Sequence, residues 1–179
     1  MVSNAEYLGF MKAEGYLRQE FWSDEGWQWN RNCQHDAPEF WQQDGQGNWY
    51  SLSAQGQSDI DANAAVSGLS WYEADAFARY AGCRLPHEFE WEAAMNSDSA
   101  LMLSTGQAWE WCANTFFPYK GFQAFPYERY STPWFDSQHY VMKGSSLYSG
   151  ESVRQPSFRN FYQPTKRHVF AGLRLAQGL

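Results

Sequence analysis

The sequence of 179 residues is poor in branched aliphatic side chains: valine is present five times and isoleucine once, at Ile60. The central strands of a doubly wound parallel sheet need runs rich in Val and Ile, so that fold is disfavoured. The sequence also lacks any apolar stretch near the ~20 residues of a membrane-spanning helix. A membrane-spanning protein is therefore excluded.

Cysteine is scarce as well, with Cys33, Cys83 and Cys112 forming no CxxC pair. An odd and widely spaced set of cysteines argues against a disulfide framework and favours a reducing compartment. The first residues, Met1–Asn4, contain no basic region followed by an apolar core, so no signal peptide is visible. We therefore expect a cytoplasmic protein.

Several chemical motifs are missing. The sequence contains no GxSxG, Walker or GxGxxG pattern, which leaves acyl-transfer hydrolases and nucleotide enzymes without support. The four histidines are scattered and show no metal-ligand spacing. The net charge of −7 argues against a nucleic-acid partner.

Aromatic residues, in contrast, are abundant: 10 Trp, 11 Tyr and 13 Phe make up 19% of the chain. Each buried ring removes roughly 150–250 Å² from water. A single domain of this length can therefore build a core from aromatic rings instead of aliphatic layers.

Local signals predict three helices. Ser3 and Glu6 form a capping box that opens a helix ending at Gly15, and Ser70 and Glu73 open a second helix that ends at Gly82. The third helix is predicted to start with Pro86 and to end near Met95.

The remaining segments predict loops and short strands. Residues 16–63 lack helical periodicity, and a hairpin is expected around Gly45–Gly47. Short strands are predicted at 109–111, 140–143 and 171–175, with a long ordered loop over 116–138. Together these elements indicate an α+β fold with much irregular backbone.

Three hypotheses concern acidic and thiol side chains of residues 88–112. The acids at 88, 90 and 92 are interpreted as a solvated face at the helix start, with acid/base chemistry as the less favoured alternative. Glu110 stands between two tryptophans, where an unpaired charge would be costly, so it should bind a cation, an arginine or backbone N–H groups. Cys112 has no histidine nearby in sequence and is expected to be a buried, inert thiol.

Charge is distributed unevenly: residues 1–119 carry 5 basic and 17 acidic side chains, and residues 120–179 carry 8 and 3. The basic C-terminal part either lines a site for an anionic small molecule or pairs with the acidic part across the fold. The run Ser157–Arg167 mixes aromatics, cations and an amide, and Tyr127 and Tyr130 add phenols. Such a mixture suits an amino-acid-like ligand with a carboxylate and a quaternary ammonium, or it holds an irregular fold together.

Three ordered blocks of sequence resemble the signature of the formylglycine-generating-enzyme (sulfatase-modifying factor) superfamily. The blocks are Gly68–Ala74 with Arg79–Glu88 and Glu90–Ala94, then Gly106–Trp111, and finally Lys143–Ser146 with Arg159–Asn160 and Phe170–Leu175. The resemblance covers essentially the whole chain. It implies a C-type-lectin-like α+β domain with little regular secondary structure.

Within the superfamily, Pro118–Phe122, Phe125–Ser131 and Pro156–Tyr162 resemble the iron-dependent sulfoxide synthases of ergothioneine biosynthesis. Those enzymes join a thiol, from cysteine or γ-glutamylcysteine, to the imidazole of trimethylhistidine with O₂ and non-haem iron. Their iron is bound by histidines of a separate N-terminal helical bundle, and the lectin-like domain forms the other wall of the pocket.

The resemblance also implies roles for individual residues. Asn160 and Phe161 would face trimethylhistidine, and Tyr162, Lys166 or Arg167 would meet the charged end of the thiol substrate. The catalytic tyrosine beside the iron would be one of two phenols, Tyr127 or Tyr130.

The chain departs from this pattern in several ways. By the resemblance, we expect residues 1–179 to form a single lectin-like domain that lacks the family's first strands and the helical bundle, and the scattered histidines offer no replacement for the iron ligands. Fe(II) is therefore expected on a helical-bundle domain or subunit, and the isolated chain should not catalyse. The paired copper-binding cysteines of formylglycine-generating enzymes are absent, and Leu103 replaces a calcium-binding Asn of some relatives, which weakens a calcium site at Glu110. The alternative hypothesis is a non-catalytic lectin-fold module that binds a ligand or a protein.

Overall fold

The computed structural model describes residues 1–53, 56–97, 102 and 105–178. Its helices are α1 (Asn4–Lys12), α2 (Asp24–Cys33), α3 (Trp71–Tyr80) and α4 (Glu88–Asn96), with short 3-10 turns η1 (Gln19–Phe21), η3 (Glu128–Tyr130), η4 (Thr132–Trp134) and η5 (Glu151–Val153). Its strands are β1 (Trp41–Gln43), β2 (Trp49–Ser53), β3 (Gly56–Asp59), β4 (Trp109–Thr115), β5 (Tyr140–Gly144), β6 (Asn160–Tyr162) and β7 (Ala171–Leu173). The mixture of helices and sheets confirms the predicted α+β class.

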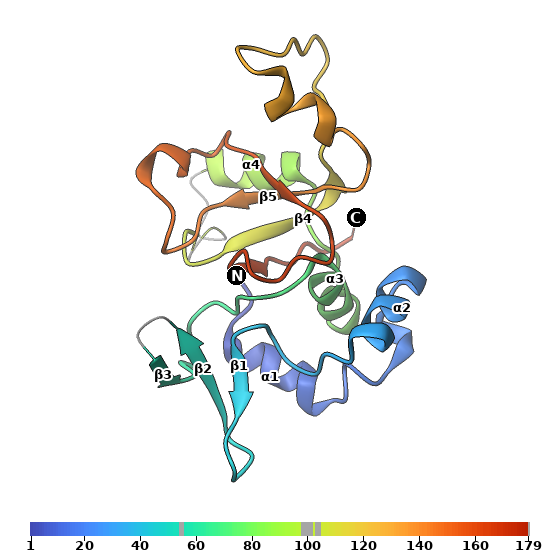
Figure 1. Cartoon of the computed structure of the whole chain (residues 1–179), viewed down its shortest axis with the longest axis vertical. Coiled ribbons are helices and arrows are strands. Elements are labelled where there is room, and N and C mark those ends of the chain that lie inside the picture. Colours follow the sequence, from blue (N-terminus) through green and yellow to red (C-terminus); the bar gives the residue numbers. More distant parts are fainter. Residues whose placement is uncertain (54–55, 98–101, 103–104, 179) are drawn as a thin grey trace.

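The strands form two sheets. Strands β1, β2 and β3 make an antiparallel sheet, and the second sheet has the order β6-β5-β4-β7. In the second sheet β4 is antiparallel to β5 and parallel to β7, so that Trp109 pairs with Gly144 on one side and with Ala171 on the other. Figure 1 shows this sheet in the upper part of the molecule beside α4, with α1, α2 and the three-stranded sheet below it.

The capping boxes predicted for two helices are confirmed. The hydroxyl oxygen of Ser3 accepts from the Glu6 N–H, and that of Ser70 accepts from the Glu73 N–H, each with the reciprocal carboxylate contact. The first helix ends at Lys12, and the Gly15 N–H then donates to the Phe10 carbonyl at 3.0 Å. These contacts fix where α1 and α3 begin, as local sequence signals should.

Three expectations need correction. The third helix begins at Glu88, not at Pro86, because the His87 ring accepts from the Phe89 N–H and acts as its N-cap. Residues 16–63 contain helix α2, whose large apolar residues, Trp27 and Trp29, are two positions apart and so lack the spacing of three or four that marks a helix. Strand β6 (Asn160–Tyr162), which falls between the predicted strands 140–143 and 171–175 where a loop is expected, pairs with β5. The hairpin at Gly45–Gly47 is confirmed between β1 and β2.

The apolar interior consists of two clusters. The larger one joins α1, α3 and both sheets through side chains such as Tyr7, Phe10 and Trp111. The smaller cluster contains Cys112, Phe116 and Val141 together with the half-buried rings of Phe135 and Phe161. Among the described residues, no helix is long and apolar enough to cross a membrane.

Candidate functional site

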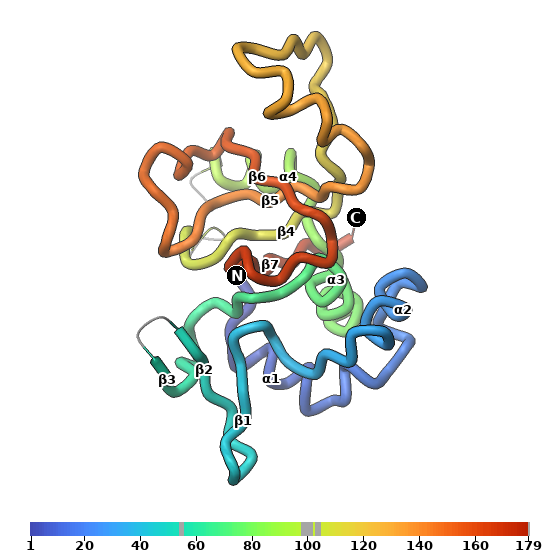
Figure 2. Tube along the Cα trace, viewed as in Figure 1, coloured from blue at the N-terminus to red at the C-terminus, as the bar shows by residue number. Residues whose placement is uncertain are grey.

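A long segment leaves the sheet after β4 and returns at the start of β5; we call residues 116–139 the projecting loop. Figure 2 shows it in gold, extending away from the sheet at the top of the view. Its described backbone has two 3-10 turns and no strand, as predicted for an ordered loop. Phe116 at its beginning stacks on Phe161 of β6, with ring centroids 4.1 Å apart and planes 12° apart. The loop is therefore held against β6 at its root.

A fully buried carboxylate, that of Glu88, fixes this root. It accepts from the Arg159 guanidinium at 2.6 and 2.7 Å, from the Asn114 amide at 2.8 Å and from the Tyr119 hydroxyl at 2.9 Å. Arg159 also donates to the Phe117 carbonyl at 2.9 Å. Because Tyr119 belongs to the projecting loop and Arg159 directly precedes β6, one carboxylate holds both sides of the site.

The interpretation of residues 88, 90 and 92 as a solvated face holds for Glu90, whose side chain is 45% exposed, and is wrong for Glu88, which is fully buried; Glu92 is half-buried. Glu90 pairs with Arg84 at 2.7 Å and Glu92 pairs with Lys143 at 2.6 Å, and Glu88 is buried against Arg159 as described. The sequence gives the positions of these acids on the helix. It does not give the distant cations that the fold brings to them.

Cations of the basic C-terminal part are also brought to distant acids by the fold. Four of its cations form ion pairs with acids of the first 119 residues: Lys143 with Glu92, Arg159 with Glu88, Arg167 with Glu73, and Arg174 with Glu110. For these four the alternative of pairing across the fold is the one observed. These four cations stabilise the fold, which leaves the other four of this part as candidates to meet an anionic ligand.

Between the projecting loop and β6 lies a cavity of about 470 Å³, which we call the inner cavity. Its walls combine aromatic rings with two guanidinium groups, an imidazole and an amide: Arg129, Tyr130, Trp134, His139, Phe158, Arg159, Asn160, Phe161 and Tyr162. The structure thus brings together four of the predicted site residues, Tyr130 and the three residues of β6.

A second cavity of about 650 Å³, the outer cavity, lies within the projecting loop. It is lined by Phe122, Phe125, Pro126, Tyr127, Arg129, Tyr130 and Ser131. Tyr127 therefore borders the outer cavity, whereas Tyr130 borders both. The two phenols are strongly exposed, at 73% and 70%.

The two predicted cations lie apart from the inner cavity. Lys166 is exposed and does not belong to its lining. Arg167 is buried and donates to Glu73 at 3.0 Å, to Glu39 at 2.9 Å and to the Ala37 carbonyl. Its guanidinium is thus engaged inside the protein, which corrects the expectation that it faces the pocket.

The sequence analysis missed three residues of the inner cavity, Arg129, Trp134 and His139. The guanidinium of Arg129 has no hydrogen-bond or ion-pair partner in the described part of the chain, and it borders both cavities. His139 is buried, and its Nδ1 lies 2.9 Å from Asp136. The position of Arg129 between Tyr127 and Tyr130 was the one available signal, because a cation beside two phenols suits a charged ligand.

Glu110 is buried and accepts from Trp91 Nε1 at 2.8 Å and from Arg174 Nε at 2.8 Å. The expected arginine partner is therefore confirmed. Leu103, the other residue considered for calcium, lies outside the described residues.

The described residues contain no group of three or more His, Cys, Asp or Glu side chains arranged to hold a metal ion. The histidines are used separately: His35 contacts Arg167, His87 caps α4, His139 pairs with Asp136, and the His168 ring lies 5.9 Å from that of Tyr162. The donor set of this part of the chain therefore does not fit an iron ion.

The three cysteines, all described, are free thiols. Burial, with Glu88 and Glu110 nearby, raises the pKa of the Cys112 thiol, as expected of an inert cysteine.

Comparison with known proteins supports the resemblance. The chain is 32% identical over 219 aligned residues to hercynine oxygenase of Mycobacterium tuberculosis, covering 98% of this chain and 50% of the relative. It is 31% identical over 86 residues to ergothioneine biosynthesis protein 1 of Schizosaccharomyces pombe, covering 47% of this chain and 11% of the relative. It is 33% identical over 106 residues to the formylglycine-generating enzyme of Thermomonospora curvata, covering 52% and 34%. The chain thus spans about half the length of the hercynine oxygenase that it matches.

The sequence profile of the sulfatase-modifying factor enzyme 1-like domain matches residues 1–102 and 96–179, which together span the whole chain. The three blocks that carry the resemblance fall on α3 to α4, on the start of β4, and on the strands β5, β6 and β7 of the second sheet. The chain belongs to the sulfatase-modifying factor enzyme 1-like domain family.

Proposed function

We propose that this domain forms the hercynine-binding wall of a non-haem iron sulfoxide synthase of ergothioneine biosynthesis. The reaction would form a C–S bond between hercynine, which is trimethylhistidine, and cysteine or γ-glutamylcysteine. The observation that carries the proposal is the inner cavity, where an amide, a free guanidinium and several ring faces meet beside β6. A relative named hercynine oxygenase aligns with 98% of this chain.

Each part of hercynine has a chemical counterpart in the inner cavity. Its trimethylammonium group cannot donate a hydrogen bond and is attracted to ring faces, which Tyr130, Trp134 and Tyr162 supply. Its carboxylate suits the guanidinium of Arg129, which replaces Lys166 and Arg167 as our candidate for that role. Asn160 uses its amide oxygen to accept from the Phe161 N–H at 3.0 Å, and its NH₂ group is available to the ligand.

The position of the two tyrosines favours one of them. Tyr130 borders both the inner and the outer cavity, and Tyr127 borders the outer cavity. A phenol that acts on a substrate in the inner cavity must reach it directly. We therefore assign the catalytic phenol to Tyr130 and a supporting role in the outer wall to Tyr127.

The iron would belong to another domain or subunit, because the described residues of this chain do not fit it. The projecting loop is the surface that such a helical bundle would cover. It presents exposed rings at Phe125, Tyr127 and Tyr130, of which Phe125 is 91% exposed. Exposed aromatic patches of this kind mark interaction sites, and covering them would close both cavities from solvent.

Calorimetric titration with hercynine tests the proposal, first with the chain alone and then with a helical-bundle partner. We expect saturable binding that weakens at least tenfold in Asn160→Ala and in Arg129→Gln, and not in Asn63→Ala, a control at an exposed turn. Histidine, which lacks the three methyl groups, should bind more weakly because it loses the contact with the ring faces.

Absence of hercynine binding even with the partner would refute the proposal and favour a non-catalytic binding module. Turnover of hercynine by the isolated chain with Fe(II) and O₂ would refute the assignment of the iron to another domain. Tyr130→Phe should abolish product formation by the complete enzyme and leave hercynine affinity within a few fold. The same replacement at Tyr127 should have the smaller effect on the rate.

A further inference from the structure

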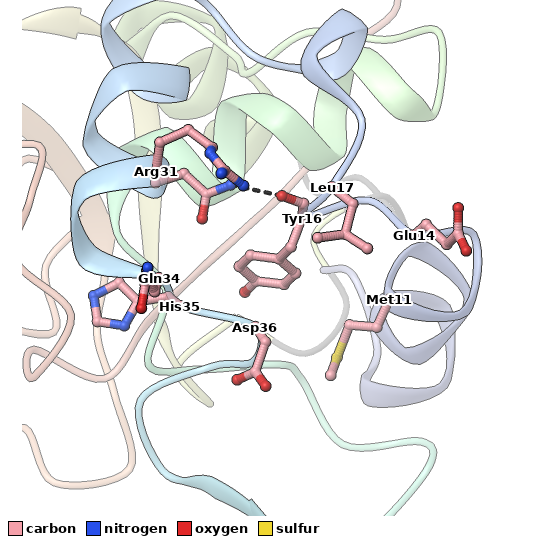
Figure 3. Close-up of a pocket in the computed structure, with 9 residues that line it drawn as sticks. Met11, Glu14, Tyr16, Leu17, Arg31, Gln34, His35 and Asp36 are labelled. Atoms are coloured by element: carbon pink, nitrogen blue, oxygen red, sulfur yellow. Dashed lines mark hydrogen bonds between the residues drawn. The ribbon is translucent and has the colours of Figure 1, made fainter.

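A third cavity lies away from the projecting loop, beside α1 and α2. Its volume is about 490 Å³, and we call it the helix-end cavity. It is lined by Met11, Glu14, Tyr16, Leu17, Asn30, Arg31, Gln34, His35 and Asp36. Figure 3 shows Tyr16 in the middle of these residues, with Arg31 above it, Asp36 below it and Met11 and Leu17 beside it.

The wall of this cavity contains a buried acceptor without a partner. Asn30 is 3% exposed, and its Nδ2 donates to the Tyr16 carbonyl at 2.7 Å, which is the dashed line in Figure 3. This bond fixes the orientation of the amide, because the flipped form would place two oxygen atoms against each other. The Asn30 Oδ1 atom then has no hydrogen-bond partner among the described residues. A buried carbonyl oxygen without a hydrogen bond lowers the stability of the protein, and a bound donor would remove that cost.

Two helices end at the same cavity. After α1 the chain turns through Glu14 with φ 59°, and after α2 it turns through Gln34 with φ 54°; both residues are in the left-handed conformation and both line the cavity. The C-terminal end of a helix carries a partial negative charge. Two such ends at one cavity favour a positively charged ligand.

The net charge of the lining side chains is also negative. Glu14 and Asp36 contribute two carboxylates, and Arg31 contributes one guanidinium, whose centre lies 5.7 Å from the Trp27 ring. Burial and the neighbouring Arg167 lower the pKa of His35, so this imidazole is neutral near pH 7. The cavity therefore has an excess of negative charge.

We propose that the helix-end cavity is a binding site for a small organic cation with N–H donors, such as a primary ammonium or a guanidinium on a short aliphatic stem. The cation would donate to Asn30 Oδ1 and lie near Glu14 and Asp36. The stem would pack on Met11, Leu17 and the Tyr16 ring. This site is separate from the inner cavity and does not depend on the proposed hercynine function.

The test is an NMR titration of the ¹⁵N-labelled chain with butylamine and butylguanidine, which are cations at pH 7. Butanol and butyrate serve as neutral and anionic ligands of the same length. We expect saturable shifts of the Asn30 side-chain amide with both cations and none with butyrate. The double variant E14Q/D36N should weaken binding at least tenfold, and Arg31→Gln should strengthen it. Glu25→Gln, at the other end of α2, is the matched control and should leave the affinity within twofold.

Failure of both cations to shift the Asn30 resonance saturably would overturn the proposal, as would equal binding of butyrate. Nα-acetyl-lysinamide distinguishes the source of the cation. Tighter binding of Nα-acetyl-lysinamide than of butylamine identifies the occupant as a lysine side chain of a partner protein. Equal or weaker binding identifies it as a free amine. Failure of the two proposals is distinguishable, because the two cavities share no lining residue: loss of butylamine binding in E14Q/D36N should leave hercynine affinity at the wild-type value, and absence of hercynine binding should leave butylamine binding unchanged.

Discussion

Replacement of Glu88 by glutamine tests whether one buried carboxylate holds the candidate site together. Glutamine keeps the size and shape of the side chain, so no cavity is created. It removes the charge that balances Arg159, and its NH₂ group must face one of the donors that the carboxylate now accepts from Arg159, Asn114 and Tyr119. The variant therefore isolates the electrostatic contribution of Glu88.

The expected loss is large because the pair is shielded from water: the Glu88 side chain is 0% exposed and that of Arg159 is 12% exposed. Breaking a buried ion pair on one side costs roughly 3–5 kcal/mol. In a chain of this size each kcal/mol corresponds to about 2–4 °C in Tm, so we expect a decrease of about 6–20 °C. Urea unfolding followed by tryptophan fluorescence, together with calorimetry, measures both quantities.

Glu90→Gln is the matched control. It lies two residues away on α4 and also pairs with an arginine, but both side chains are exposed, at 45% and 40%. Exposed ion pairs contribute little, so its effect should be less than about a third of that of Glu88→Gln. If the two variants lose similar stability, or if Glu88→Gln unfolds with the wild-type midpoint, the reasoning on the buried pair is refuted.

Three further predictions concern other parts of the chain. The hydrogen bond from Arg84 lowers the pKa of Glu90 to about 2. The stability that this pair provides is therefore present above pH ~4.5 and is lost as the pH falls towards 2. The difference in urea midpoint between wild type and Glu90→Gln should shrink over that range, and a constant difference would contradict the assignment. Gly172→Ala should destabilise the protein by at least ~2 kcal/mol in urea unfolding, because the added methyl group would collide with the Val66 carbonyl oxygen; a neutral effect would show that β7 can move away. Cys112 should react with iodoacetamide only after unfolding, whereas the exposed cysteine that ends α2 should react in the native protein, and mass spectrometry of native and urea-unfolded samples decides this.

The sequence predicts well those structural features that depend on a few neighbouring residues. The capping boxes at Ser3 and Ser70 depend on contacts within three residues, and both are present. The short strand predicted at Trp109–Trp111 is present as the start of β4. Helix α2 was not predicted because its two tryptophans, Trp27 and Trp29, are two positions apart and its fully buried positions are Gly26 and Asn30, so no helical period of apolar residues is visible. The resemblance to the family extended these local signals to the order of the elements.

The candidate site depends on distant pairs, which periodicity cannot reveal. Glu88 and Arg159 are 71 positions apart, and Glu73 and Arg167 are 94 positions apart. The sequence shows these arginines as available cations, while the fold uses them to neutralise buried acids. Arg129, which is close in sequence to the tyrosines, is the cation that stays accessible to the inner cavity.

The smaller apolar cluster has a consequence for the dynamics of the site. Cys112, Phe116 and Val141, with Phe135 and Phe161, pack under the projecting loop as a unit distinct from the main core. A unit with few buried side chains can open at lower free energy than the whole domain. Amide hydrogen exchange around the inner cavity should therefore be faster than in α1 and α3, which would let the loop adapt to a ligand or to a second domain while the body of the protein stays folded.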